Sequence, residues 1–207
     1  MPNGAIYLPN CTGKLVIEHN TIYNILSSGT RSGIEVLNQN IPVSSEILIK
    51  KNSVSNIGDN AIFIGHNSPS GDVEALVKEN QVFNVGQTGD GYFIGTQGST
   101  AGGRLLAKIE ENFCQNTVGF NMEIQSTGTA HVHADVKRNK LQVASVVGFA
   151  ASSHDSSHLC LKLVRNTSDA GYSLTQAGSS VFKLNNKPGN IGLPFVTSGT
   201  IQNGKCL

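Results

Sequence analysis

The sequence predicts an all-β fold, a parallel β-helix in which short strands stack coil upon coil. Three observations support this fold class. A segment with alternating apolar residues and two asparagines recurs along the chain, a glycine-led apolar segment alternates with it, and neither has the 3.6-residue period of a helix. Because repetition at a fixed spacing is typical of solenoids, it decides the fold class before any single motif is considered.

The first recurring segment is clearest at residues 15–25, 47–57 and 75–85, and weaker copies centre on Asn112, Asn139 and Asn166. Each copy has apolar residues on alternate positions, then an asparagine, an apolar residue two positions on, and a second asparagine. Period-two alternation is typical of a strand with one buried face. We expect the inward columns Leu15/Ile47/Ala75/Ala107/Ala134/Leu161, Ile17/Ile49/Val77/Ile109/Val136/Leu163 and Ile22/Val54/Val82/Cys114/Leu141.

The second segment resembles Gly4-Ala5-Ile6-Tyr7-Leu8 and returns at residues 33–36, 61–64, 91–94, 119–122, 148–151 and 171–174. Its first apolar residues, which include Tyr92, Phe120 and Phe149, are expected to share one inward column. The middle residue of each copy is expected to point outward. That outward column contains Tyr7, Glu35, Phe63, Phe93, Asn121, Ala150 and Ser173.

The two segments alternate once per ~28 residues, and a unit of this size cannot bury its own apolar side, so it must stack on its neighbours. We therefore expect one β-helix of six to seven coils over residues 1–184 and an irregular C-terminal cover over 185–207. The second segment is already running at Gly4. Since solenoids cover such open edges, we expect a preceding segment or a partner to cap the first coil.

The asparagine columns have two physical explanations. Asparagine tolerates the left-handed backbone region that a sharp bend between sheets requires. Stacked asparagine side chains also form hydrogen bonds from coil to coil. Both properties predict an architectural ladder Asn20/Asn52/Asn80/Asn112/Asn139/Asn166 and a shorter ladder Asn24/Asn56/Asn84/Asn116.

Composition excludes several classes of partner. Charged residues make up 14% of the chain and the formal net charge is +1, which gives no electrostatic reason to expect nucleic acid. No apolar run approaches the ~20 residues of a membrane span, and no signal peptide is visible. No two cysteines form a Cys-x-x-Cys pair, so we expect no zinc site built from them. We also expect no other metal and no cofactor.

Repeats with this order of apolar residues, asparagines and glycines resemble the right-handed parallel β-helix repeats of the pectate-lyase-like superfamily, over roughly residues 4–176. The resemblance implies a right-handed β-helix. It implies no single activity, because that superfamily contains lyases, glycoside hydrolases, esterases, adhesins and phage tail proteins.

Two candidate sites lie along the second segments. Phe63 and Phe93 suggest a sugar-stacking strip with Tyr7, Glu35 and Asn121 beside it; alternatively, a turn at 66–72 or 96–103 covers the rings. Next to this strip, Glu35, Asp59 and Asp90 could form an acid/base pair, because adjacent coils would place carboxylates ~5 Å apart and alternate coils ~10 Å apart. Alternatively, Gly58-Asp59-Asn60 and Gly89-Asp90-Gly91 are ordinary turns.

The resemblance is partial at these acids. Superfamily hydrolases that act on polygalacturonan carry Gly-Asp-Asp before the corresponding strand. Here Asp59 matches the first aspartate, but Asn60 occupies the position of the second, and no Asn-Thr-Asp precedes it.

A third candidate site lies on the outward face of the first-type segments of two consecutive coils. Alternating histidine and aspartate on one strand face could accept a metal, and the resemblance implies that a lysine could act as a lyase base. The alternative is a solvated sheet face with an Asp135–Lys162 cross-strand pair. The residues concerned are His131, His133, Asp135, Lys137, His158 and Lys162.

From these features we expect a non-catalytic or vestigial extracellular domain, secreted or at the cell surface. It would recognise a polysaccharide or cell-surface glycan, or act as a rigid scaffold. The alternative is a polysaccharide-active enzyme, a uronate lyase or glycoside hydrolase, of which this chain is possibly one part. The sequence alone leaves enzymatic activity open.

Overall fold

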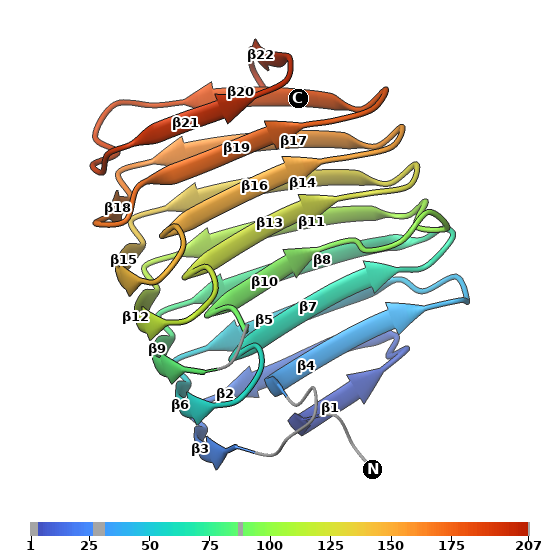
Figure 1. Cartoon of the computed structure of the whole chain (residues 1–207). Coiled ribbons are helices and arrows are strands. Elements are labelled where there is room, and N and C mark those ends of the chain that lie inside the picture. Colours follow the sequence, from blue (N-terminus) through green and yellow to red (C-terminus); the bar gives the residue numbers. More distant parts are fainter. Residues whose placement is uncertain (1–3, 27–31, 87–88, 207) are drawn as a thin grey trace.

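The computed structural model describes residues 4–26, 32–86 and 89–206, which form 22 β-strands and no helix. The strands build a parallel β-solenoid of about six turns, as the repeats predict. Figure 1 shows the coils stacked along one axis, with sheet A in front, sheet B behind and the short sheet C along one side. Within the described ranges there is no helix long and apolar enough to cross a membrane.

Every strand pairs in parallel with its equivalent in the next coil. Sheet A contains β1 (Gly4–Pro9), β4 (Ser32–Gln39), β7 (Ile62–Asn67), β10 (Tyr92–Gly95), β13 (Met122–Ser126), β16 (Phe149–Ser153), β19 (Tyr172–Gln176) and β21 (Phe195–Ser198). Sheet B contains β2 (Gly13–Glu18), β5 (Ser45–Lys50), β8 (Asp72–Lys78), β11 (Arg104–Glu110), β14 (His131–Lys137), β17 (His158–Val164), β20 (Val181–Asn186) and β22 (Ile201–Asn203). Sheet C contains β3 (Thr21–Ile25), β6 (Ser53–Ile57), β9 (Gln81–Val85), β12 (Phe113–Thr117), β15 (Lys140–Ala144) and β18 (Thr167–Ser168).

The three predicted inward columns of sheets B and C are confirmed by the strand register. Their side chains form one continuous apolar core along the axis. Among the residues of these columns, only Leu15 is partly exposed. Each coil therefore buries its apolar side against the next, which is the source of solenoid stability.

The register of sheet A differs from the prediction at one coil. Met122, not Phe120, pairs with Tyr92 and with Phe149, so the fifth coil enters sheet A two residues later than the sequence suggests. The prediction that Asn121 points outward is therefore wrong. Asn121 is fully buried, and its amide accepts a hydrogen bond from Thr117 Oγ1 (2.8 Å) and donates one to the Gln142 carbonyl (3.1 Å).

Both asparagine ladders are present. In the buried ladder, each side-chain amide donates to the carboxamide oxygen of the next asparagine, for example from Asn80 to Asn112 at 3.0 Å. A further member, Asn190, extends the ladder by one coil. The second ladder, from Asn24 to Asn116, is exposed to solvent.

Only one ladder uses the left-handed backbone. The second-ladder asparagines have positive φ, such as 60° at Asn24 and 63° at Asn116, as expected. In the buried ladder the residue before each asparagine has the positive φ, so the prediction of a left-handed asparagine is wrong there. The asparagines of this ladder are explained by their hydrogen bonds only. The preceding residues are His19, Lys51, Glu79, Glu111, Arg138 and Arg165.

In the coil after that of Asn116, the position of the exposed ladder is occupied by Val143, which has a φ of 51°. A β-branched residue is strained in this conformation. We expect Val143→Asn to stabilise the fold by roughly 1 kcal/mol, because it relieves the strain and adds a bond to Asn116. Urea unfolding measures this gain. Val146→Asn, at another exposed valine without positive φ, serves as control, and an equal gain there would refute the explanation.

Beyond residue 184, where the sequence suggests irregular cover, β21 and β22 continue sheets A and B. A disulfide that the sequence did not predict joins Cys160 of β17 to Cys206. Cys114 is buried, as expected for an apolar filler, and Cys11 is free.

Candidate functional site

The outer face of sheet A carries a mixed aromatic and acidic column. Its register is Tyr7, Glu35, Phe63, Phe93, Glu123, Ala150 and Ser173. Glu123 takes the place predicted for Asn121, so sequence analysis missed one acidic residue of the site. The alternation in Met122-Glu123-Ile124 is the signal that could have located it.

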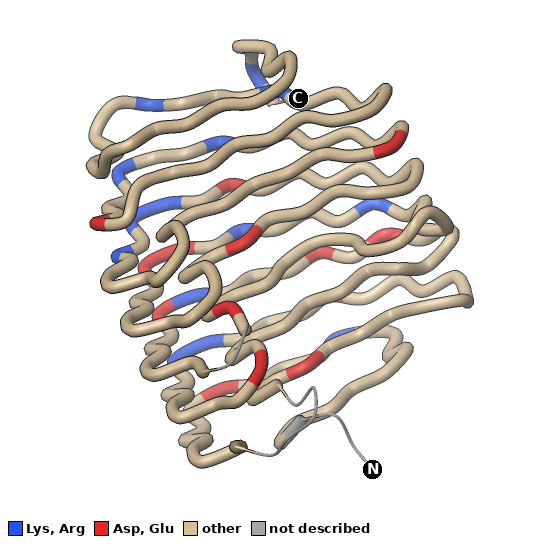
Figure 2. The backbone as a smooth tube through the Cα atoms, in the orientation of Figure 1, with Lys and Arg blue, Asp and Glu red and all other residues tan. Residues whose placement is uncertain are grey.

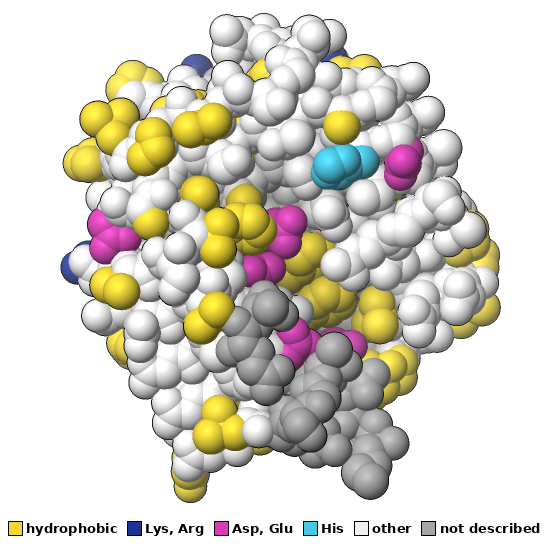
Figure 3. All heavy atoms as spheres, in the orientation of Figure 1, with side chains coloured by type: hydrophobic (Ala, Val, Ile, Leu, Met, Phe, Trp, Pro, Cys, Tyr) yellow, Lys and Arg dark blue, Asp and Glu magenta, His cyan; other side chains and the backbone are white. Residues whose placement is uncertain are grey.

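Phe63 and Phe93 stack on each other in the middle of the column, with ring centroids 4.8 Å apart and an interplanar angle of 11°. Only 8% of Phe63 and 2% of Phe93 is exposed, so the two rings are largely covered and do not form an open strip. Figure 3 shows a hollow on this side of the solenoid, with hydrophobic side chains on its floor and acidic side chains in groups above and below. Tyr7, at the start of the column, is half-buried.

Four carboxyl groups form an electrostatically connected row. The charge of Asp59 acts on both Glu35 and Asp90, and Asp90 is hydrogen-bonded to Glu123. Asp59 and Asp90 come from the bends that lead from sheet C into sheet A, whereas Glu35 and Glu123 lie on β4 and β13. The structure thus brings together the three acids predicted from sequence and adds Glu123.

Backbone contacts fix the position of Asp90. Its N–H donates to Asn60 Oδ1 at 2.9 Å, and its Oδ1 accepts the N–H of Phe120 at 2.8 Å. Asn60, the departure from the hydrolase motif, therefore positions Asp90 from the preceding coil. The contact with Phe120 also holds the two extra residues of the fifth coil in place.

Burial gives the Asp90–Glu123 pair unusual proton affinities. Burial raises the pKa of Asp90 to about 6, although the Phe120 N–H opposes the shift. Burial, together with the charge of Asp90, raises the pKa of Glu123 to about 8. At neutral pH the two carboxyl groups therefore share a proton in a hydrogen bond between them.

The other two acids are perturbed in the same direction. Burial raises the pKa of Asp59. Burial also raises the pKa of Glu35, with a smaller contribution from the charge of Asp59 and an opposing hydrogen bond from Ser32. The hollow therefore combines a proton donor with carboxylates that accept hydrogen bonds, and both lie beside an apolar floor.

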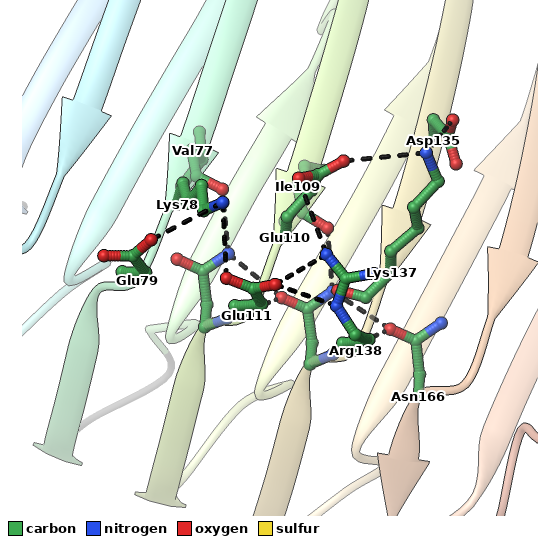
Figure 4. A network of polar contacts seen from close by, with 12 residues as sticks. Val77, Lys78, Glu79, Ile109, Glu110, Glu111, Asp135, Lys137, Arg138 and Asn166 are labelled. Atoms are coloured by element: carbon green, nitrogen blue, oxygen red, sulfur yellow. Dashed lines mark hydrogen bonds and ion pairs between the residues drawn. The ribbon is translucent and has the colours of Figure 1, made fainter.

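The third candidate group, on the outer face of sheet B, is organised by ion pairs. The Asp135 carboxylate contacts Lys137 Nζ at 2.8 Å and Lys162 Nζ at 3.1 Å, and Lys137 also approaches Glu110 at 3.6 Å. Figure 4 shows the contacts of Asp135, Lys137 and Glu110 continuing through Arg138 and Glu111 to Lys78 and Glu79. In Figure 2, basic and acidic residues alternate along this side of the solenoid.

These contacts disfavour a catalytic base in the third group. The hydrogen bond to Asp135 raises the pKa of Lys137, whereas a lysine base needs a lowered pKa. His131 and His158 stack on each other with ring centroids 4.5 Å apart. Among the described residues, no three histidine, cysteine or acidic side chains are grouped as a metal site requires.

Comparison of the chain with protein-family models, with curated proteins and with solved structures finds no match. The functional argument therefore depends on the geometry of the site.

Proposed function

We propose that the protein is a glycan-recognising β-solenoid of the pectate-lyase-like type, and that the hollow on sheet A is its binding site. The observation that supports this most is the stacked Phe63–Phe93 floor beside four acidic side chains. Sugars present apolar C–H faces and hydroxyl groups, and they are bound by apolar surfaces with a few convergent polar groups.

The charge of the hollow indicates which glycans fit. Carboxylates accept hydrogen bonds from sugar hydroxyl groups and attract ammonium groups, but they repel the carboxylates of uronate chains. We therefore favour a neutral or amino-sugar chain over polygalacturonate. A secreted or cell-surface location is part of this proposal, and the Cys160–Cys206 disulfide supports it, because disulfides persist in oxidising compartments.

Glycoside hydrolysis is a second candidate function, and one observation favours it. A carboxyl pair that retains a proton at neutral pH, as Asp90 and Glu123 do, can supply the general acid that glycoside hydrolysis requires. In this reading Glu123 donates a proton to the departing glycosidic oxygen, and ionised Asp59 or Asp90 activates water or attacks the sugar.

Both proposals can be tested in one experiment. The protein would be titrated with oligosaccharides of chitosan, mannan, xylan and polygalacturonate, with binding measured by calorimetry and cleavage by reducing-end release. We expect a neutral or amino-sugar oligosaccharide to bind, and Phe93→Leu to weaken binding about tenfold, which corresponds to about 1.4 kcal/mol. Glu46→Gln, at an exposed carboxylate on sheet B, is the matched control.

The variants at the acidic pair separate recognition from catalysis. If the protein hydrolyses its ligand, Glu123→Gln should abolish product release but preserve binding. Binding without release in the wild-type protein would reject the hydrolase proposal and leave recognition. Binding that Phe93→Leu and Asp90→Asn leave unchanged would reject the hollow as the site.

A further inference from the structure

A second concavity, of about 220 Å³, lies on the outer face of sheet B across β11, β14, β17 and β20. No aspartate or glutamate is among its lining residues. Six of those residues are basic or become basic on protonation: Arg104, His131, His133, His158, Lys183 and Lys205.

Strand register arranges these groups in two rows. Arg104, His131 and His158 follow one another in consecutive coils, and so do His133, Cys160 and Lys183 in the next outward row. Consecutive coils are separated by about 4.8 Å. Several cationic groups therefore converge within the reach of a single small anion.

Most nearby acidic groups are already paired. Asp72 contacts Arg104 at 2.8 Å, and Asp135 is held by Lys137 and Lys162. In the part of the chain that the structure describes, neither Lys183 nor Lys205 forms an ion pair. The pocket thus has positive charge without a counter-charge from the protein.

The disulfide completes the pocket. Cys160 lies between His133 and Lys183 in the second row, and it is bonded to Cys206. Because Lys205 is adjacent to Cys206 in the sequence, the bond fixes its backbone at the edge of the pocket.

We propose that this pocket on sheet B binds an oxyanion, a sulfate, phosphate or carboxylate group, with Lys183, Lys205 and the stacked pair His131/His158 as its principal partners. Lysine and protonated imidazole donate charge-assisted hydrogen bonds to such oxygens. This site is separate from the sheet A hollow, so its failure would leave the proposed glycan site untouched.

Histidine protonation should make the binding depend on pH. Burial lowers the pKa of His158, and the charges of His131 and Lys183 contribute; burial also lowers the pKa of His133, with Asp135 opposing and Lys162 assisting. An anion in the pocket would stabilise the protonated rings and raise both values. The charged groups around these rings are Asp72, Arg104, Lys108, Asp135, Lys162, Lys183 and Lys205.

The test is a titration of the disulfide-intact protein with sodium sulfate, followed by histidine side-chain NMR at constant ionic strength. We expect saturable chemical-shift changes at His131 and His158. The affinity for sulfate should be at least fivefold higher near pH 5.5 than near pH 8, because protonated histidine rings attract the anion. Sulfate itself stays a dianion over this range, so the ligand does not cause the change. Lys183→Ala/Lys205→Ala should weaken binding about tenfold, whereas the exposed pair Lys14→Ala/Lys187→Ala should not.

Parallel titrations with inorganic phosphate, acetate and glucose 6-sulfate identify the source of the group. Tighter binding of glucose 6-sulfate than of sulfate would indicate a sugar-borne anion, and equal binding a free anion. Shifts that do not saturate, or equal losses in the two double variants, would overturn the proposal. Retention of the wild-type chemical shifts elsewhere verifies that each variant is folded.

Discussion

Asn112→Ala is expected to destabilise the fold by roughly 3 kcal/mol, the largest effect of any single side-chain truncation considered for this solenoid. Asn112 is 1% exposed, and its amide donates to Asn139 Oδ1 and to the Val77 carbonyl. Its own oxygen accepts both the backbone and the side-chain N–H of Asn80. Truncation would leave buried donors and an acceptor without partners, each costing about 1–3 kcal/mol.

The exposed ladder provides the control for this experiment. Asn84 also bonds to asparagines in both adjacent coils, but water can replace these contacts. Asn84→Ala should therefore cost about 1 kcal/mol, including the strain of alanine at its φ of 55°. Equal losses for the two variants in urea unfolding would show that burial of the ladder does not determine its contribution.

The second large effect concerns pH. Replacing the acidic pair, by Asp90→Asn/Glu123→Gln, should stabilise the protein relative to wild type by an amount that grows as the pH rises. A carboxyl whose pKa is higher in the folded state contributes stability below its unfolded value, and this stability is lost as the pH rises through the folded value. The pKa of Asp90 rises on folding from 3.8 to about 6, and that of Glu123 from 4.5 to about 8. The stability that each group contributes is therefore lost as the pH rises across these two ranges.

The expected gain between pH 4 and pH 8 is several kcal/mol, since the two pKa values together lie between five and six units above their unfolded values and one unit corresponds to about 1.4 kcal/mol. Measuring the difference between variant and wild type cancels the contributions of other titrating groups, such as Asp135. A flat difference for the double variant would mean that the pair is ionised in the folded protein.

Much of the fold could be predicted because it depends on local repetition. The alternation around Ile49 and Val77 and the asparagines that follow recur in every coil, and each copy confirms the register of the others. Asn190 was missed because it follows the last clear repeat, in a segment whose own apolar alternation is weak.

The site was less predictable because it depends on the register at one irregular bend. Gly119-Phe120 has the same form as Gly91-Tyr92 and Gly148-Phe149, so sequence analysis starts the strand there. The Asp90 carboxylate, which belongs to the preceding coil, accepts the Phe120 N–H and delays the strand. This contact comes from a neighbouring coil and decides whether Asn121 or Glu123 faces the hollow; the only local hint of it is the alternation in Met122-Glu123-Ile124.

The Cys160–Cys206 disulfide has a consequence for how the solenoid comes apart. A stack of coils that contact only their neighbours can fray inward from either end, one rung at a time. The disulfide encloses a loop with a sequence separation of 46, which includes β18, β19, β20, β21 and β22. Unzipping from the C-terminal end is therefore restrained while the bond is intact, because the coils between Cys160 and Cys206 cannot separate fully from one another.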